Sequence, residues 1–390
     1  MMIDTSKGVT AAQGFLASGV AAGLKKSGGK DIALVVSQGP NWDAAGVFTS
    51  NRFFAAPVGW SRQAISDGTL KAVVLNSGGA NACTGAQGDA DAEQMARLVA
   101  QAIEASPQDV GVASTGLIGD HLPMDLVSAG IAAGIASLDS DGGGDAAQAI
   151  MTTDTVSKQA SYASDQGWSV GGMAKGAGML APALATMLIV ITTDADLSDT
   201  DIQATLLAST HVSFDRADSD GCMSTNDTVL LLANGASGVK PDPAQFSSAL
   251  TDVCVSLARQ LIADAEGAEH SITVTATGAA TEADALEVAR SVARSNLFKC
   301  AIAGNDPNWG RVLASIGTTS ATFDPATVDV AFNGVEVFHQ GAPGRDRSEV
   351  DLHPFDVEVV ISLNAGQTTA TIWTNDLTHG YVSENSDYSS

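Results

Sequence analysis

Short apolar runs alternate with helical stripes along most of the chain, and this pattern predicts a mixed α/β fold. Strands are expected where an apolar run ends in turn residues, at 32–36, 71–75, 111–119, 187–193, 271–277, 356–363 and 368–374. Helices are expected where apolar residues recur every three or four positions, at 89–105, from 198 or 199 onward, at 246–261 and at 285–297. Strands and helices alternate irregularly, which indicates α/β or α+β rather than a Rossmann fold or a barrel.

Two connecting segments have recognisable turn chemistry. Asn333-Gly334 stands between apolar alternations at 327–338, which is typical of a β-hairpin. Residues 137–147 are rich in Ser, Asp and Gly and are expected to form an exposed loop.

The composition narrows the class of protein. Of the 390 residues, 45% are hydrophobic and 16% are charged, as in a globular protein. The formal net charge of −25 opposes binding to nucleic acid or an anionic membrane, since both need clustered Lys and Arg. The first residues do not resemble a secretory signal, and no apolar run approaches the roughly 20 residues of a membrane-spanning helix. We therefore expect a cytoplasmic protein with no nucleic-acid or membrane partner.

The cysteines and histidines indicate neither a disulfide framework nor a metal site. Cys83, Cys222, Cys254 and Cys300 lack a Cys-x-x-Cys spacing, and the six histidines show no spacing typical of a metal site or a catalytic triad. We expect reduced thiols and no metal.

The run from Ala181 to Val190 contains the strongest candidate nucleophile. A glycine-rich loop with Lys175 leads into a proline turn, the small residue Ala185, Thr186 and a strongly apolar segment. Attack of the Thr186 hydroxyl on the Ala185 carbonyl gives an ester by N-to-O acyl shift, and water then releases a new amino terminus at Thr186. That threonine carries both nucleophile and base, because an α-amino group titrates at about 7.7–8.0. From composition alone, the same run is a buried strand with one threonine.

The segments around this run resemble blocks of the ornithine acetyltransferase family of arginine biosynthesis. The blocks follow the family's order over nearly the whole chain, and together they are far more specific than any one of them. They are Asn76-Ser77-Gly78, Ala80-Asn81-Ala82-Cys83-Thr84-Gly85, Ser114-Thr115-Gly116-Leu117-Ile118-Gly119, Met151-Thr152-Thr153-Asp154-Thr155, Gly171-Gly172-Met173-Ala174-Lys175-Gly176, Ser224-Thr225-Asn226-Asp227-Thr228, Asp264-Ala265-Glu266-Gly267, Asp306-Pro307-Asn308-Trp309-Gly310-Arg311 and the run from Tyr381 to Ser390.

The resemblance implies an Ntn-hydrolase-like fold, with helices layered on central sheets. It implies cleavage between Ala185 and Thr186 into an α segment, 1–185, and a β segment, 186–390, which stay together as one catalytic unit and form a multimer such as a heterotetramer. The implied reaction moves acetyl from N-acetylornithine to glutamate through an acetyl-threonyl intermediate and gives ornithine and N-acetylglutamate. No cofactor is implied; some family members also take acetyl-CoA as donor, and the sequence does not decide this.

The resemblance also assigns site residues. Thr115 and Gly116 match the family's oxyanion hole, although alone they would be read as a turn after a strand. Its substrate contacts correspond to Thr152, Lys175, Thr186, Glu266, Asn385 and Ser390. By their chemistry, Thr153 and Thr155 would serve as well as Thr152. Without the resemblance, Lys175 would be interpreted as a solvated surface lysine and Glu266 as part of a solvated helix end. A tail such as 381–390 is otherwise expected to fray. Asn226 and Asp227 are expected to shape the pocket wall or to fix loops.

Other functions remain open on the sequence. A self-processed amidohydrolase or aminopeptidase would pass the acyl group from Thr186 to water, and acceleration by glutamate would distinguish the transferase from it. A related acetyltransferase of secondary metabolism would differ only in substrate range. An acidic binding protein without catalysis is disfavoured because Thr115, Gly116, Lys175 and Thr186 are all present.

Overall fold

The computed structural model describes residues 2–180 and 187–387, which form two compact units. Within the described residues, the first unit comprises 2–180, 187–215 and 222–261, and the second comprises 216–221 and 262–387. The predicted segments 1–185 and 186–390 are defined by chain cleavage, so this spatial division does not test them. In the described part of the chain, no helix is long and apolar enough to cross a membrane.

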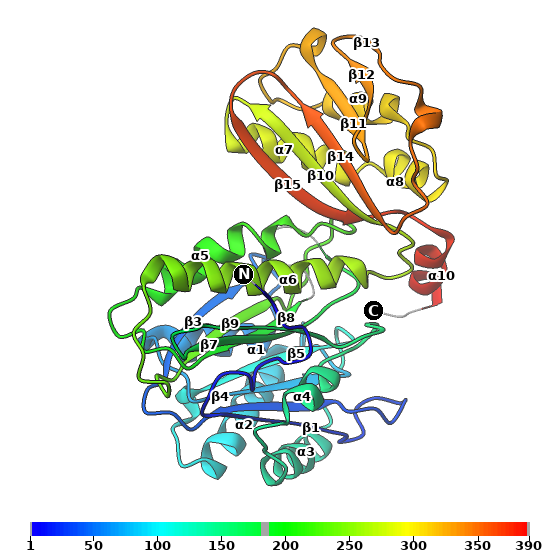
Figure 1. The fold of residues 1–390 in the computed structure, drawn as a ribbon. Coiled ribbons are helices and arrows are strands. Elements are labelled where there is room, and N and C mark those ends of the chain that lie inside the picture. Colours follow the sequence, from blue (N-terminus) through cyan, green and yellow to red (C-terminus); the bar gives the residue numbers. More distant parts are fainter. Residues whose placement is uncertain (1, 181–186, 388–390) are drawn as a thin grey trace. The chain divides into compact units, whose positions relative to one another are not determined.

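Two stacked sheets form the centre of the first unit (Figure 1). The four-stranded sheet has the order β1 (Phe15–Val20), β2 (Ile32–Ser37), β4 (Ala72–Ser77) and β5 (Val110–Thr115). The five-stranded sheet has the order β3 (Asp43–Phe48), β9 (Thr228–Ala233), β8 (Leu188–Thr193), β7 (Ser169–Lys175) and β6 (Lys158–Ala163). Strands β2, β4, β5, β8 and β9 are buried along their whole length, which explains why they appear in the sequence as continuous apolar runs.

Helices cover the outer faces of both sheets and complete four layers (Figure 1). The helices of this unit are α1 (Ala56–Ala64), α2 (Gly85–Ala102), α3 (Met124–Ala136), α4 (Gly143–Ala149), α5 (Ile202–His211) and most of α6 (Pro243–Ala263). One apolar core fills the space between the sheets, and α2 and α3 pack on the outer face of the four-stranded sheet. On the other side, α6 approaches β7 so closely that a Cβ at Gly172 would lie 3.0 Å from Leu257. The layers therefore run helix, sheet, sheet, helix.

The second unit is one six-stranded sheet with α7, α8 and α9 on one face (Figure 1). Its strand order is β13 (Ala342–Pro343), β12 (Val335–His339), β11 (Asp329–Phe332), β14 (Asp356–Ser362), β10 (Ser271–Ala279) and β15 (Thr368–Asn375). The helices are α7 (Glu282–Ala293), α8 (Asn296–Ala303), α9 (Trp309–Ile316) and α10 (His379–Asp387). In the predicted strand β10, Ile272 and Val274 share the buried face. The Asn333-Gly334 hairpin is also confirmed, with both residues at positive φ.

Some predicted elements need correction. The expected loop at 137–147 is wrong in its second half, because α4 begins at Gly143 and buries Ala146 and Ala147. Glycine there allows close contact rather than exposure: a Cβ at Gly142 would lie 1.9 Å from the carbonyl oxygen of Ala17.

Two predicted helices differ at their ends. The segment at 285–297 is divided, because α7 ends at Ala293 and the Ser295 side chain caps α8. The helix expected from 198 or 199 begins at Ile202, where Asp201 is the cap.

Candidate active site

The turn after β5 places Thr115 and Gly116. Thr115 is buried, and its carbonyl oxygen accepts the N–H groups of Gly78 and Gly79 at 2.9 and 3.1 Å. Gly116 has a φ of 133°, and a Cβ there would lie 2.4 Å from the backbone nitrogen of Gly79. Only glycine fits this position, because any side chain would separate the two backbone segments. The turn is therefore built by close backbone contact with the loop after β4.

Asn226 connects this turn to the loop before β9. Its side-chain nitrogen donates to the carbonyl oxygens of Ser114 and Ala80, at 2.8 and 2.6 Å. The Ser114 hydroxyl in turn donates to Asn76 at 2.6 Å. Three sequence blocks that are far apart along the chain thus form one buried hydrogen-bond network, which fixes the backbone around Thr115.

Lys175, at the end of β7, brings two of the predicted residues together. Its ammonium donates to the Thr152 hydroxyl at 2.7 Å and to the Thr115 hydroxyl at 3.4 Å. The residue is only 1% exposed, so a solvated surface lysine is ruled out. Of the three threonines compared in the sequence, Thr152 is thus placed on the Lys175 ammonium. Lys175 also pairs with Leu188 across β7 and β8, two positions after Thr186 in the sequence.

Asp154 is the counter-charge of this site, and the sequence reasoning missed its role. Its carboxylate pairs with Lys158 at 2.7 Å and lies 3.8 Å from the Lys175 ammonium. It also accepts the N–H groups of Thr152 and Gly176, at 2.9 and 2.7 Å. Burial alone would raise the pKa of Asp154, but the neighbouring ammonium groups of Lys175 and Lys158 outweigh it and hold the pKa well below its usual range.

Among the described residues, the lysines near Asp154 outnumber the ionised carboxylates, which are Asp154 itself and Asp31 near Lys25. Lys158 and Lys175 are both buried, and Lys25 lies within electrostatic range of Lys175 and Asp154. The chain has only 19 basic residues against 44 acidic ones, so its composition does not explain a cluster of lysines at one place. The cluster favours an anionic ligand such as a carboxylate. Asp154 lies inside a recognised sequence block, which was the one available signal; Lys158 had none.

Asp227 fixes the start of β8. It is fully buried, and its Oδ1 accepts the N–H of Met187 at 3.0 Å. Burial raises the pKa of this carboxyl well above its usual range, against the opposing effects of the Met187 N–H, the Thr49 hydroxyl and Lys175. The sequence reasoning placed Asp227 in a pocket wall or a loop. The structure instead joins it to the residue that follows Thr186 in the chain.

The second unit joins Glu266 and Asn385. The Asn385 side-chain nitrogen donates to the half-buried Glu266 carboxylate at 2.9 Å. The tail containing Asn385 is helix α10, which packs against the loop of Glu266: a Cβ at Gly267 would lie 2.2 Å from the backbone nitrogen of Tyr381. The alternative of a frayed tail is therefore wrong as far as Asp387. Ser390, like Ala185 and Thr186, lies outside the described residues.

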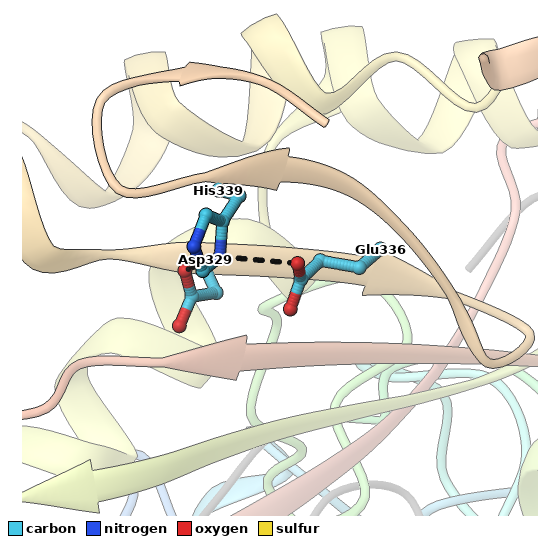
Figure 2. A group of neighbouring side chains, drawn as sticks. All are labelled: Asp329, Glu336 and His339. Atoms are coloured by element: carbon cyan, nitrogen blue, oxygen red, sulfur yellow. Dashed lines mark ion pairs between the residues drawn. The ribbon is translucent and has the colours of Figure 1, made fainter. Parts of the chain in front are cut away.

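One further group of side chains has the chemistry of metal ligands. Asp329, Glu336 and His339 lie together on the hairpin strands β11 and β12 (Figure 2). The His339 Nδ1 lies 2.9 Å from Asp329 and 3.1 Å from Glu336. Glu336 and His339 are solvent-exposed, and Asp329 is partly so. The imidazole thus already occupies the space between the two carboxylates, as in a surface ion-pair cluster.

The fold and site together define a layered α/β enzyme with a buried ammonium between two threonine hydroxyls, one at the end of β5 and one in the loop before β6. The model of the ArgJ family matches residues 16–390. The arginine biosynthesis bifunctional protein ArgJ of Streptomyces avermitilis is 59% identical over 382 residues, covering 98% of this chain and 100% of the relative. The protein of that name from Thermobifida fusca is 57% identical over 381 residues, covering 98% and 99%. The chain belongs to the ArgJ family.

A solved structure is also similar. It is ornithine acetyltransferase complexed with ornithine from Mycobacterium tuberculosis, 51% identical to this chain, covering 48% of this chain and 99% of that chain, with a TM-score of 0.46. The family match confirms the resemblance drawn from the sequence blocks, and the layered sheets confirm the mixed α/β class. The chain is an enzyme of this family.

Proposed function

We propose that this enzyme cleaves itself before Thr186 and then transfers acetyl from N-acetylornithine to glutamate in arginine biosynthesis. The observation that carries the proposal is the placement of the Lys175 ammonium on the hydroxyls of Thr115 and Thr152, beside the start of β8. The names of the closely similar proteins support the same pathway.

Maturation requires one acyl shift and one hydrolysis. The Thr186 Oγ attacks the carbonyl carbon of Ala185, and the bond from that carbon to the Thr186 nitrogen breaks as the nitrogen takes up the hydroxyl proton. Water then cleaves the ester, leaving a carboxylate on Ala185 and restoring the Thr186 hydroxyl. The products are the segments 1–185 and 186–390, with a free α-amino group on Thr186 as the base for catalysis.

Transfer follows in two balanced steps. The Thr186 Oγ attacks the acetyl carbon of N-acetylornithine while its α-amino group takes the hydroxyl proton. The carbon–nitrogen bond then breaks, and ornithine leaves with that proton on its amine. In the second step the glutamate amine attacks the acetyl ester, and the Thr186 Oγ leaves with the proton that the amine loses. Each step passes through an oxyanion, for which Thr115 and Gly116 are the proposed donors.

Charge is the proposed basis of substrate recognition. Both substrates carry an α-carboxylate, which suits the positive excess at Lys175. Glu266, whose carboxylate accepts from Asn385, suits an ammonium group of the substrate. Ser390 is proposed as a further contact. No cofactor is needed for these steps, and acetyl-CoA is proposed as a second acetyl donor because the similar proteins are named bifunctional. We propose a multimer of the two-segment unit.

Denaturing mass spectrometry with amino-terminal sequencing tests the proposal. The wild type should give two pieces of similar size from the 39.4 kDa chain, one beginning Thr186-Met187-Leu188. Thr186→Ala should remain one chain and transfer no acetyl group, whereas Thr186→Ser retains a hydroxyl and should still be cleaved. An uncleaved wild type, or a cleaved and active Thr186→Ala, contradicts the mechanism.

The cleaved enzyme is then assayed with N-acetylornithine, with and without glutamate. Acceleration of ornithine release by glutamate supports transfer, whereas release at one rate in both cases identifies a hydrolase. Acetyl-CoA with glutamate tests the second donor.

A further inference from the structure

The buried carboxyl of Asp227 stands at the junction where the proposed nucleophile enters the fold. Asp227 precedes β9, and Met187 precedes the neighbouring parallel strand β8. The Met187 N–H donates to Asp227 Oδ1 at 3.0 Å, and the Met187 carbonyl oxygen accepts the N–H of Thr228 at 3.1 Å. Both backbone polar groups of Met187 are therefore held by two consecutive residues.

This arrangement acts on the peptide bond that joins residue 186 to Met187. The Met187 nitrogen is bonded to the carbonyl carbon of residue 186, and the peptide group is planar. An acceptor that fixes the N–H therefore fixes the plane of the whole peptide. Met187 is itself completely buried, which leaves its backbone little freedom to adjust.

A second buried aspartate, Asp194, provides a comparison for Asp227. Asp194 follows the other end of β8, and each of its oxygens accepts a backbone N–H at 2.7 Å, from Ser169 and from Gln13. Asp227 accepts from Met187 through Oδ1, but its buried Oδ2 has no hydrogen-bond partner among the described residues. An unpaired buried polar atom is costly, so Oδ2 adds no stability that would account for a carboxyl at this position.

We infer that Asp227 is a positioning residue for Thr186, acting through the Met187 N–H in self-cleavage and again in acetyl transfer. This inference rests on the proposed function. Because the burial of Asp227 favours the neutral carboxyl, asparagine matches its charge as well as its shape and keeps an oxygen acceptor.

The test separates the acceptor from the rest of the side chain. Asp227→Asn retains the acceptor and should cleave and turn over within about twofold of wild type. Asp227→Ala removes it, and Asp227→Leu also fills the space that a substitute water would take. Both should slow cleavage in a cell-free synthesis time course by about 10- to 100-fold, the size of effect expected when a reacting group is misplaced.

Steady-state kinetics on the matured protein provide the readout that a merely structural role would not change. In Asp227→Ala and Asp227→Leu, kcat should fall by about the same 10- to 100-fold. The KM for N-acetylornithine should stay within about twofold, because no proposed substrate contact is altered. Asp194→Asn and Asp194→Ala, at a buried aspartate beyond the far end of β8, are matched controls and should keep the wild-type rates per folded molecule.

The outcomes are distinct. Wild-type rates in the folded Asp227→Ala or Asp227→Leu proteins overturn the inference while leaving the proposed function intact. A slow Asp227→Asn also overturns it, because the acceptor is then not what matters. If the apolar variants do not fold, Asp227→Asn decides the question by itself. An uncleaved wild type, by contrast, removes the proposed function.

Discussion

Asp154 is the side chain on which the other charges of the candidate site depend. It holds Lys158, lies beside Lys175, and binds the backbone of Thr152 and Gly176. A buried carboxylate with this many partners fixes the direction of the Lys175 ammonium. The charge of Asp154 stabilises the buried ammonium groups, because a buried ammonium without a counter-charge is strongly unfavourable.

Asp154→Asn should therefore destabilise the protein although it changes the shape of the side chain very little. The expected loss is about 3–5 kcal/mol in the free energy of unfolding, the cost of removing one partner of a buried ion pair. Urea denaturation of wild type and variant measures it. The double variant Asp154→Asn with Lys158→Met removes one positive charge as well and should recover part of the loss; a strictly additive result would contradict the proposed coupling.

The same pair of proteins predicts a pH dependence. The folded pKa of Asp154 lies below its unfolded value of about 3.9, so the unfolded state binds the proton first as the pH falls. The stability that Asp154 contributes is present above about pH 4 and is lost below it. The difference in unfolding free energy between wild type and Asp154→Asn should be constant from pH 7 to 5 and shrink below pH 4. A difference that grows on acidification would contradict the prediction, because the folded pKa of Asp154 would then lie above its unfolded value.

Spacing along the sequence did not predict that Lys175, Thr115 and Thr152 lie together. Lys175 is 60 residues from Thr115 and 23 from Thr152, so no local spacing relates the three side chains. Family resemblance named them as site residues, but it gave Asp154 and Lys158 no role. Buried charges that support a site are missed in this way because a single Asp or Lys in a sequence looks the same whether solvated or buried.

The turn that ends β5 is the element on which the proposed oxyanion hole depends. Its Gly116 has a φ of 133° and touches the backbone of Gly78 and Gly79. Gly119, in the same turn, has a φ of 94° but would have nothing within 4 Å of a Cβ. Substitution of Gly119 therefore tests backbone strain alone, whereas substitution of Gly116 tests strain together with steric contact.

Gly116→Ala should abolish cleavage and transfer, because its Cβ pushes the turn away from the loop after β4. Gly119→Ala should lose only the strain energy of about 1–3 kcal/mol and remain cleaved. Mass spectrometry and thermal melts of both variants measure these effects. Full cleavage in Gly116→Ala would mean that the turn adapts and that its close contact is not needed.

Uniform burial made several strands predictable from the sequence, although β9, which is also buried at every position, was not predicted. The strands β2, β4, β5 and β8 are buried at every position and were expected from their apolar runs. Strand β7 was not predicted: Gly171 and Gly172 weaken its apolar pattern, yet glycine is there because neighbouring chain and α6 approach it closely. Apart from the Asn333-Gly334 hairpin, the local pattern did not predict which strands pair, because pairing depends on contacts between distant segments.

The net charge of −25 acts on the molecule as a whole. Repulsion among these negative charges opposes the compact state. Salt weakens the repulsion, because the Debye length falls from about 30 Å at 0.01 M to about 10 Å at 0.1 M. Nineteen basic residues cannot neutralise forty-four acidic ones, so pairing across the surface leaves most of the negative charge unbalanced. Lys158 and Lys175, beside Asp154, are buried and are screened much less.

Raising NaCl from 0.01 to 0.3 M at pH 7 should therefore raise the midpoint of thermal unfolding, by about 1 °C for each kcal/mol of repulsion removed in a protein of this size. The effect should fade as the pH approaches the sequence pI of 4.3, where the net charge vanishes.

Glutamate carries one more negative charge than N-acetylornithine at neutral pH. The KM for glutamate should therefore fall as NaCl is raised over the same range, while the KM for N-acetylornithine changes less. Melting curves and initial rates across a NaCl series at pH 7 and pH 5 measure both effects. A midpoint that falls with salt at pH 7 would mean that attractive ion pairs outweigh the overall repulsion, and that the acidic composition stabilises the fold rather than opposing it.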